Sequence, residues 1–125
     1  MIGYVTIGTN DLPRAAAFFD DLLGALGATR FMEEETFIAW TKGGEGCGLG
    51  VTKPFDGNAA SVGNGVMVAL EADSRETVDR IYQKARDLGA ADEGAPGERM
   101  PGFYAGYFRD LDGNKFNVFH MKMGD

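Results

Sequence analysis

The sequence predicts an α+β fold built from two βαβββ repeats, whose sheets form an open curved-sheet cup with the helices outside. Two observations support the duplication. A strand, a capping residue and a helix follow one another twice, roughly sixty residues apart, and Leu-Gly-Ala recurs at 26–28 and 88–90. A third observation concerns packing. The helices cover one face of each sheet, so the other faces stay uncovered unless the two sheets curl toward one another.

The first repeat spans about residues 1–53. Alternating apolar and polar side chains predict an opening strand over 3–8. Thr9-Asn10-Asp11 then supplies capping side chains, and apolar residues at three- and four-residue spacing predict a helix that ends at Gly27. Three further strands complete the repeat, at 29–33, 36–41 and 47–53.

A Gly-, Pro- and Asn-rich linker over about 54–65 joins the first repeat to the second, which spans about 66–125 of a single domain. Ser74 is predicted to cap the second helix and Gly89 to close it. The strands of this repeat are predicted at 66–71 and 90–93, with a closing β-hairpin within 102–121. The segment 94–101 is predicted as a loop.

The composition excludes several classes of partner. The net charge is −7, from 12 basic and 19 acidic residues, which argues against nucleic-acid binding. No apolar run approaches the roughly 20 residues of a membrane span. The start of the sequence lacks a signal-peptide pattern, and the single cysteine, Cys47, excludes an internal disulfide. We therefore expect a soluble, cytoplasmic protein with a small-molecule partner.

The segment Phe108-Arg109-Asp110-Leu111-Asp112-Gly113-Asn114, followed by a short strand, carries a family likeness. It resembles the closing hairpin of the vicinal oxygen chelate superfamily, which includes glyoxalase I, bleomycin-resistance proteins and extradiol dioxygenases. Pro54-Phe55-Asp56-Gly57 with Gly63-Asn64-Gly65 is similar to a loop of a glyoxalase-like bacterial subgroup. The resemblance covers nearly the whole chain, agrees with the duplicated fold and implies a homodimer.

Catalytic members of the family hold a divalent metal with His and Glu side chains in the cup. By this resemblance, the metal-ligand positions of the chain are Tyr4, Met67 and Asn117. A phenol, a thioether and a carboxamide do not neutralise a divalent ion as imidazoles and a carboxylate do. His120 is the only histidine, so no site with two histidines forms within one chain. The sequence therefore predicts no metal and no other cofactor.

The alternation of the last strand places His120 on the face opposite Asn117, toward the helices, where we expect a structural, hydrogen-bonded histidine. Its use in catalysis is the alternative. Metal-free chemistry with Tyr4 as a donor and Glu71 as a base is conceivable, but no catalytic residue is assigned. Whether the protein is an enzyme is left open.

The predicted ligand-binding residues share an apolar, aromatic or neutral polar character that is typical of small-molecule pockets. They are Tyr4, Thr6, Trp40, Met67, Tyr107, Asn117 and Phe119, with Phe37 as the alternative to Trp40 on its strand. The sequence thus predicts a glyoxalase-like, bleomycin resistance-like protein that binds an apolar or aromatic small molecule without a metal. The alternatives are a metal-dependent lyase, isomerase or dioxygenase with atypical ligands, a cup filled as core, and a non-catalytic interaction module.

Overall fold

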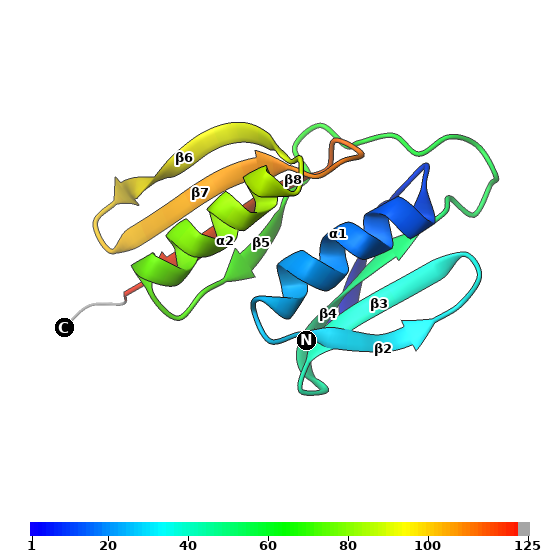
Figure 1. Cartoon of the computed structure of the whole chain (residues 1–125), viewed down its shortest axis with the longest axis horizontal. Coiled ribbons are helices and arrows are strands. Elements are labelled where there is room, and N and C mark those ends of the chain that lie inside the picture. Colours follow the sequence, from blue (N-terminus) through cyan, green and yellow to red (C-terminus); the bar gives the residue numbers. More distant parts are fainter. Residues whose placement is uncertain (123–125) are drawn as a thin grey trace. The chain divides into compact units, whose positions relative to one another are not determined.

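The computed structural model describes residues 1–122 and divides into two compact units, one from Met1 to Val62 and the other from Gly63 onward. Each unit has one four-stranded sheet with one helix packed on it (Figure 1). Both units follow the order strand, helix, strand, strand, strand. The predicted α+β fold of two βαβββ repeats is therefore confirmed.

The first unit contains β1 (Tyr4–Gly8), α1 (Leu12–Gly24), β2 (Thr29–Glu33), β3 (Phe37–Lys42) and β4 (Glu45–Thr52). The strand order in its sheet is β1-β4-β3-β2. β1 runs parallel to β4, whereas the other pairs are antiparallel. The parallel pair requires a crossover, which α1 supplies.

The second unit contains β5 (Val68–Glu71), α2 (Arg75–Asp87), β6 (Ala91–Met100), β7 (Phe103–Arg109) and β8 (Lys115–Met121). Its strand order, β5-β8-β7-β6, repeats that of the first unit, with β5 parallel to β8. The corner between β7 and β8 is held by Asp110, whose Oδ1 accepts hydrogen bonds from the backbone N–H groups of Asp112 (2.9 Å) and Asn114 (2.8 Å). The motif with the family likeness is thus a side-chain-stabilised turn.

The two helices are capped in the same way at both ends. Asp11 accepts a hydrogen bond from the backbone N–H of Arg14, and Ser74 accepts one from that of Thr77, each at 3.1 Å. The repeated Leu-Gly-Ala sequences are both C-caps with a left-handed glycine. Ala28 N–H donates to the Leu23 carbonyl across Gly27 (φ 91°), and Ala90 N–H donates to that of Ala85 across Gly89 (φ 106°). The repeated Leu-Gly-Ala sequence therefore marks the C-terminal end of each helix.

The largest difference from the predicted boundaries is at β6. The segment 94–101 was expected to be a loop, but β6 continues to Met100. β6 lies at the edge of its sheet, and its pairing with β7 shifts register three times, between Asp92 and Gly94, Gly94 and Gly97, and Glu98 and Met100. An irregular edge strand accommodates Pro96 and these glycines because its outer N–H groups need no partner. β5 also begins two residues later than predicted, at Val68.

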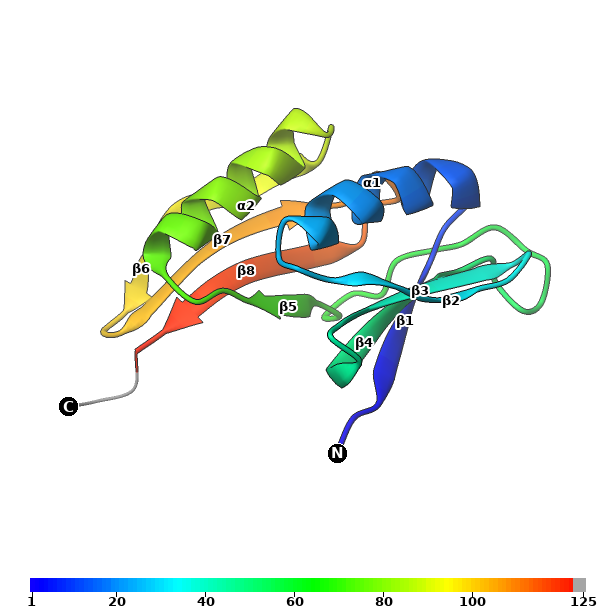
Figure 2. The ribbon, with the colours of Figure 1, turned by 60° about the horizontal axis from the view of Figure 1, so that its bottom comes forward.

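Each unit has its own apolar core between its helix and one face of its sheet. In the first unit Phe18, Phe19 and Leu22 of α1 are buried, and in the second Val78 and Ile81 of α2. The opposite face of each sheet has no helix on it (Figure 2). We call these the open faces. Within residues 1–122, no helix has the length and hydrophobicity needed to cross a bilayer.

Candidate functional site

The open face of the first sheet carries aromatic rings above glycines. Tyr4 is 57% exposed, and its ring centroid lies 6.2 Å from that of Phe37. A Cβ added to Gly50 would lie 2.6 Å from Cε2 of Phe37, and one added to Gly48 would lie 3.0 Å from Cε1 of Phe31. The glycines therefore leave the space that these rings occupy. Thr6 is exposed on the same face, directly opposite Gly50.

Trp40 does not belong to this open face, so its assignment to the binding surface is wrong. Its side chain points toward α1, is 1% exposed, and donates a hydrogen bond from Nε1 to Asp20 at 2.9 Å. Its ring centroid lies 5.8 Å from that of Phe19. Phe37, the alternative from the same strand, occupies the open face instead.

Asp20 is the polar anchor of that helix contact. Arg30 donates hydrogen bonds to both of its carboxylate oxygens, at 2.9 and 2.7 Å. These hydrogen bonds, together with the one from Trp40, hold the pKa of Asp20 below its usual range. The network fixes β2 and β3 against α1 and serves structure, not ligand binding.

The open face of the second sheet is built around Asn117. Asn117 lies opposite Ala69 of β5 and Tyr107 of β7, and these side chains share one face of the sheet. It is 2% exposed, and among the described residues no donor reaches its Oδ1. Phe119 is on the same face, two residues along β8, and stacks on Phe103 with ring centroids 5.6 Å apart. Three predicted residues, Tyr107, Asn117 and Phe119, therefore do come together.

Two cations that the sequence analysis did not single out lie on this face. The guanidinium carbon of Arg99 is 5.4 Å, and Nζ of Lys115 5.8 Å, from the centroid of the Tyr107 ring. Both distances lie within the range of cation–π contacts. Lys115 precedes Asn117 by two residues on β8, a spacing that could have revealed it. Arg99 lies on a segment that was predicted as a loop, so the sequence did not indicate on which face of a sheet its side chain lies.

The three positions that resemble metal-ligand positions do not fit a divalent ion chemically. Tyr4 and Asn117 are neutral, and Met67 is a 42% exposed thioether just before β5. Among residues 1–122 there is also no group of three or more His, Cys, Asp or Glu side chains that could hold a metal ion. These positions therefore do not suit a divalent metal ion.

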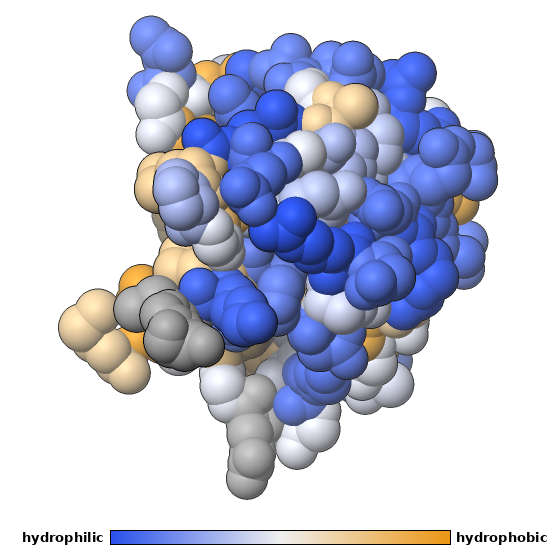
Figure 3. Space-filling view, turned by 90° about the vertical axis from the view of Figure 1, so that its left-hand side faces the viewer, coloured by the Kyte–Doolittle hydropathy of each residue, from blue (hydrophilic) through white to orange (hydrophobic). Residues whose placement is uncertain are grey.

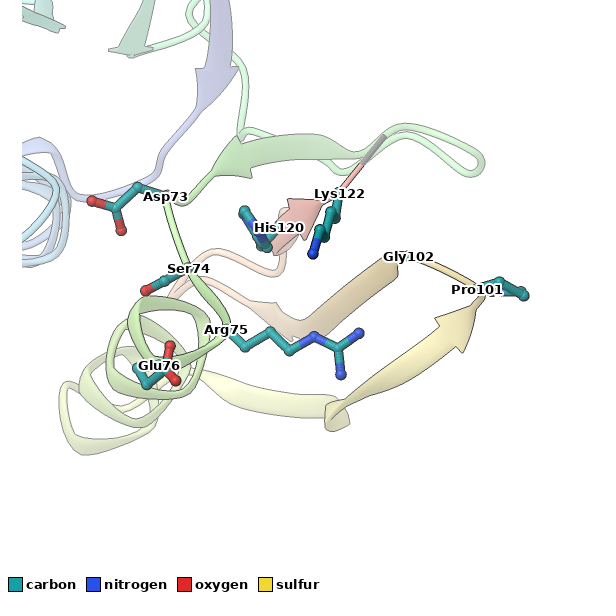
Figure 4. Close-up of a pocket in the computed structure, with 8 residues that line it drawn as sticks. All are labelled: Asp73, Ser74, Arg75, Glu76, Pro101, Gly102, His120 and Lys122. Carbon is teal, nitrogen blue, oxygen red and sulfur yellow. The ribbon is translucent and has the colours of Figure 1, made fainter. Parts of the chain in front are cut away.

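His120 lies on the helix-facing side of β8, where its Nδ1 is 3.1 Å from the carbonyl oxygen of Ala72. A carbonyl only accepts, so Nδ1 donates. His120 also lines a surface pocket of about 650 Å³ at the start of α2, between Asp73, Arg75, Gly102 and Lys122 (Figure 4). Most of the residues that line the pocket are polar or charged, and most of the surface that Figure 3 shows is hydrophilic.

This pocket is a weaker candidate than the open face of the second sheet. Arg75 points into it in Figure 4 but is already paired with Glu98 and lies over the Tyr104 ring. Tyr104 in turn donates a hydrogen bond to Asp79, which raises the pKa of its phenol. The charge of Arg75 is thus already neutralised by a carboxylate of the chain.

Comparison with known proteins places this geometry in a family. The model of the glyoxalase/bleomycin resistance protein/dioxygenase superfamily matches residues 1–118. The chain belongs to this superfamily. A glyoxalase/bleomycin resistance protein from Albidiferax ferrireducens T118 is 32% identical, with a TM-score of 0.89 over 98% of this chain and 99% of that one. No curated protein matches the sequence.

More distant superfamily structures share the fold alone. A glyoxalase/bleomycin resistance protein/dioxygenase family enzyme from Burkholderia phytofirmans PsJN is 19% identical, with a TM-score of 0.78 over 96% of this chain and 98% of that one. A lactoylglutathione lyase from Agrobacterium tumefaciens is 21% identical, with a TM-score of 0.72 over 96% and 92% of the two chains. The resemblance to this superfamily that was noted from the sequence is confirmed by the family match over residues 1–118.

Proposed function

We propose that this protein binds an apolar or aromatic small molecule on the open face of its second sheet without a metal ion. The observation that carries the proposal is the buried Oδ1 of Asn117, which has no donor among the described residues. An unsatisfied buried acceptor destabilises the folded protein by roughly 1–3 kcal/mol. The presence of such an acceptor at Asn117 therefore favours a role in binding. A ligand that donates a hydrogen bond to this oxygen satisfies it.

The surroundings of Asn117 suit such a ligand. Tyr107, Phe103 and Phe119 offer aromatic surface on the same face, each only partly buried. Pockets for small molecules combine apolar walls with a few polar groups that fix orientation. The aromatic surface here would supply affinity, and the hydrogen bond to the carboxamide would fix the orientation of the ligand.

On the first sheet, the open face supports a second role. Tyr4 and Thr6 are exposed on this face, as is Phe31 at 47%. We propose that such apolar surface is covered in a cytoplasmic homodimer. The exposed thiol of Cys47 fits a reducing compartment. Light scattering after gel filtration gives the mass, and a monomer at all concentrations would contradict the dimer.

The metal-free proposal is tested by elemental analysis and thermal shift on protein purified without a metal-affinity tag. We expect under about a tenth of an equivalent of Zn, Ni, Fe or Mn, and unfolding temperatures that chelator does not change. Among catechols, thioesters and aromatic antibiotics, a ligand at 100 times its Kd stabilises by about 2.7 kcal/mol. Near-stoichiometric metal whose removal lowers the unfolding temperature would instead support a metal-dependent lyase, isomerase or dioxygenase.

A further inference from the structure

Resting on that proposed function, we propose that the ligand is an aromatic anion with a hydrogen-bond donor at the end away from its charge. Its carboxylate or phosphate group is held by Lys115 and Arg99, its ring lies against Tyr107, and its donor reaches Oδ1 of Asn117. On this proposal, the polar atoms of this face select ligands by charge and hydrogen bonding, in addition to the affinity that the apolar surface provides.

The first argument is the charge of Lys115 and Arg99. Neither forms an ion pair with a carboxylate of the described residues, although acids outnumber bases by 19 to 12 in the chain. Four of the other six arginines are in ion pairs with carboxylates, for example Arg109 with Glu93 at 3.0 Å and Arg30 with Asp20 at 2.7 Å. Two unpaired cations beside one ring, in a protein of net charge −7, favour an anionic ligand.

The second argument is that Arg99 is held in place. Its Nη2 donates a hydrogen bond to the backbone carbonyl of Ala95. The backbone of Gly94 lies beside both groups, since a Cβ there would be in ordinary van der Waals contact with Nη2 of Arg99 (3.4 Å) and Cδ1 of Tyr107 (3.5 Å). The guanidinium therefore rests on Tyr107 in a defined position, and a positioned cation loses less entropy when it binds an anion.

The third argument is spacing. Lys115 and Asn117 lie two residues apart on one face of β8, which separates their Cα atoms by about 6.5–7 Å. Tyr107 lies directly opposite Asn117. A ring placed along β8 reaches the carboxamide at one end and the ammonium at the other. It enters by parting Tyr107 and Lys115, which are only partly buried.

A matched set of three probes tests this: 4-hydroxybenzoate, its methyl ester, and 4-methoxybenzoate. The ester lacks the charge, and the methoxy compound lacks the donor. In calorimetric titrations at low salt we expect the acid to bind about tenfold or more tightly than the ester, and about tenfold more tightly than the methoxy compound. Raising NaCl from 50 to 500 mM weakens the acid and leaves the ester unchanged.

Variants assign each preference to its residue. Lys115→Met combined with Arg99→Met should remove the preference for acid over ester, whereas Asn117→Leu should remove the preference for hydroxyl over methoxy. Arg80→Gln, which removes an exposed charge on α2, is the matched control and keeps both preferences. Far-UV circular dichroism checks that each variant is folded.

The outcomes separate the two proposals. Equal binding of acid and ester to the wild type overturns the anionic ligand but leaves small-molecule binding intact. Preferences that persist in the Lys115/Arg99 or Asn117 variants overturn the assignment to this face. Failure of all three probes at 10 mM, while a neutral aromatic raises the unfolding temperature, also rejects the anionic ligand. Failure of every aromatic rejects the proposed function itself.

Discussion

The two sheets share one topology but hold opposite kinds of side chains at the same place. Gly50 lies opposite Thr6 and Ala39, whereas Asn117 lies opposite Ala69 and Tyr107. Both Thr6 and Ala69 precede the first residue of their helix by six positions, so Gly50 and Asn117 are equivalent. By the same register, Gly48 corresponds to Lys115.

The difference changes what each open face can do. In the first sheet, Gly48 and Gly50 leave space for the rings of Phe31 and Phe37, which give the face apolar surface. In the second, an amide and an ammonium replace the two glycines, and Tyr107 replaces Ala39. The two repeats thus share one backbone topology but differ in chemistry: the open face of the first sheet carries apolar rings, and that of the second carries an amide and an ammonium.

The largest expected effect comes from filling the glycine position of the first sheet. In Gly50→Val, the new Cβ meets the Phe37 ring at 2.6 Å and Cγ2 of Thr6 at 3.3 Å, so the ring has to leave the face. We expect the free energy of unfolding to fall by about 2 kcal/mol, as is usual for overpacking. Urea denaturation followed by fluorescence of Trp40, the only tryptophan, reports on this unit.

Gly3→Val is the matched control for that change. No atom lies within 4 Å of a Cβ added at Gly3, so its denaturation midpoint should stay close to that of the wild type. A Gly50→Val protein as stable as the control would show that Phe37 moves freely, and the contrast between the two faces would lose its basis.

The equivalent change in the second sheet should have the opposite sign and a smaller size. Asn117→Leu removes an unsatisfied buried oxygen at similar side-chain volume, so we expect the free energy of unfolding to rise by about 1 kcal/mol. Asn64→Leu, at an exposed position, should stay within about 0.5 kcal/mol of the wild type. Destabilisation by Asn117→Leu, measured by urea denaturation, would mean that the amide serves the fold.

Local sequence signals were enough to predict the fold. Capping residues, apolar spacing and the two Leu-Gly-Ala helix ends are read within a few residues, and the structure keeps each of them. The edge strand β6 was predicted only over 90–93, because Gly94, Pro96 and Gly97 indicate a loop unless a neighbouring strand tolerates an irregular register.

The candidate site was less predictable because it depends on faces and register. Every residue from Phe37 to Trp40 is apolar, so alternation alone cannot say which side chains point toward α1. The hydrogen bond between Trp40 and Asp20, twenty positions apart, decides it. The grouping of Arg99 and Lys115 on Tyr107 likewise joins three strands, and only the two-residue spacing from Lys115 to Asn117 can be read in the linear sequence.

The smallest expected effect contrasts one aspartate of each unit. Hydrogen bonds from Arg30 lower the pKa of Asp20, whereas burial raises the pKa of Asp110 despite its hydrogen bonds from Asn114 and Asp112. Ionised Asp20 therefore adds stability at neutral pH that is lost as the pH falls through its folded pKa. Ionised Asp110 does the reverse: its burial penalty acts above its folded pKa and disappears below about pH 4, the unfolded value.

Single amide variants separate these opposite contributions. We expect the loss of stability between pH 7 and pH 3, measured from urea midpoints, to be smaller in Asp20→Asn than in the wild type and larger in Asp110→Asn. Each variant removes one carboxylate, so the change in net charge is the same and each serves as the control for the other. If both variants shifted the acid-induced loss of stability in the same direction, net charge and not the two local environments would govern that loss. The two units would then differ in their open faces but not in how these aspartates affect stability.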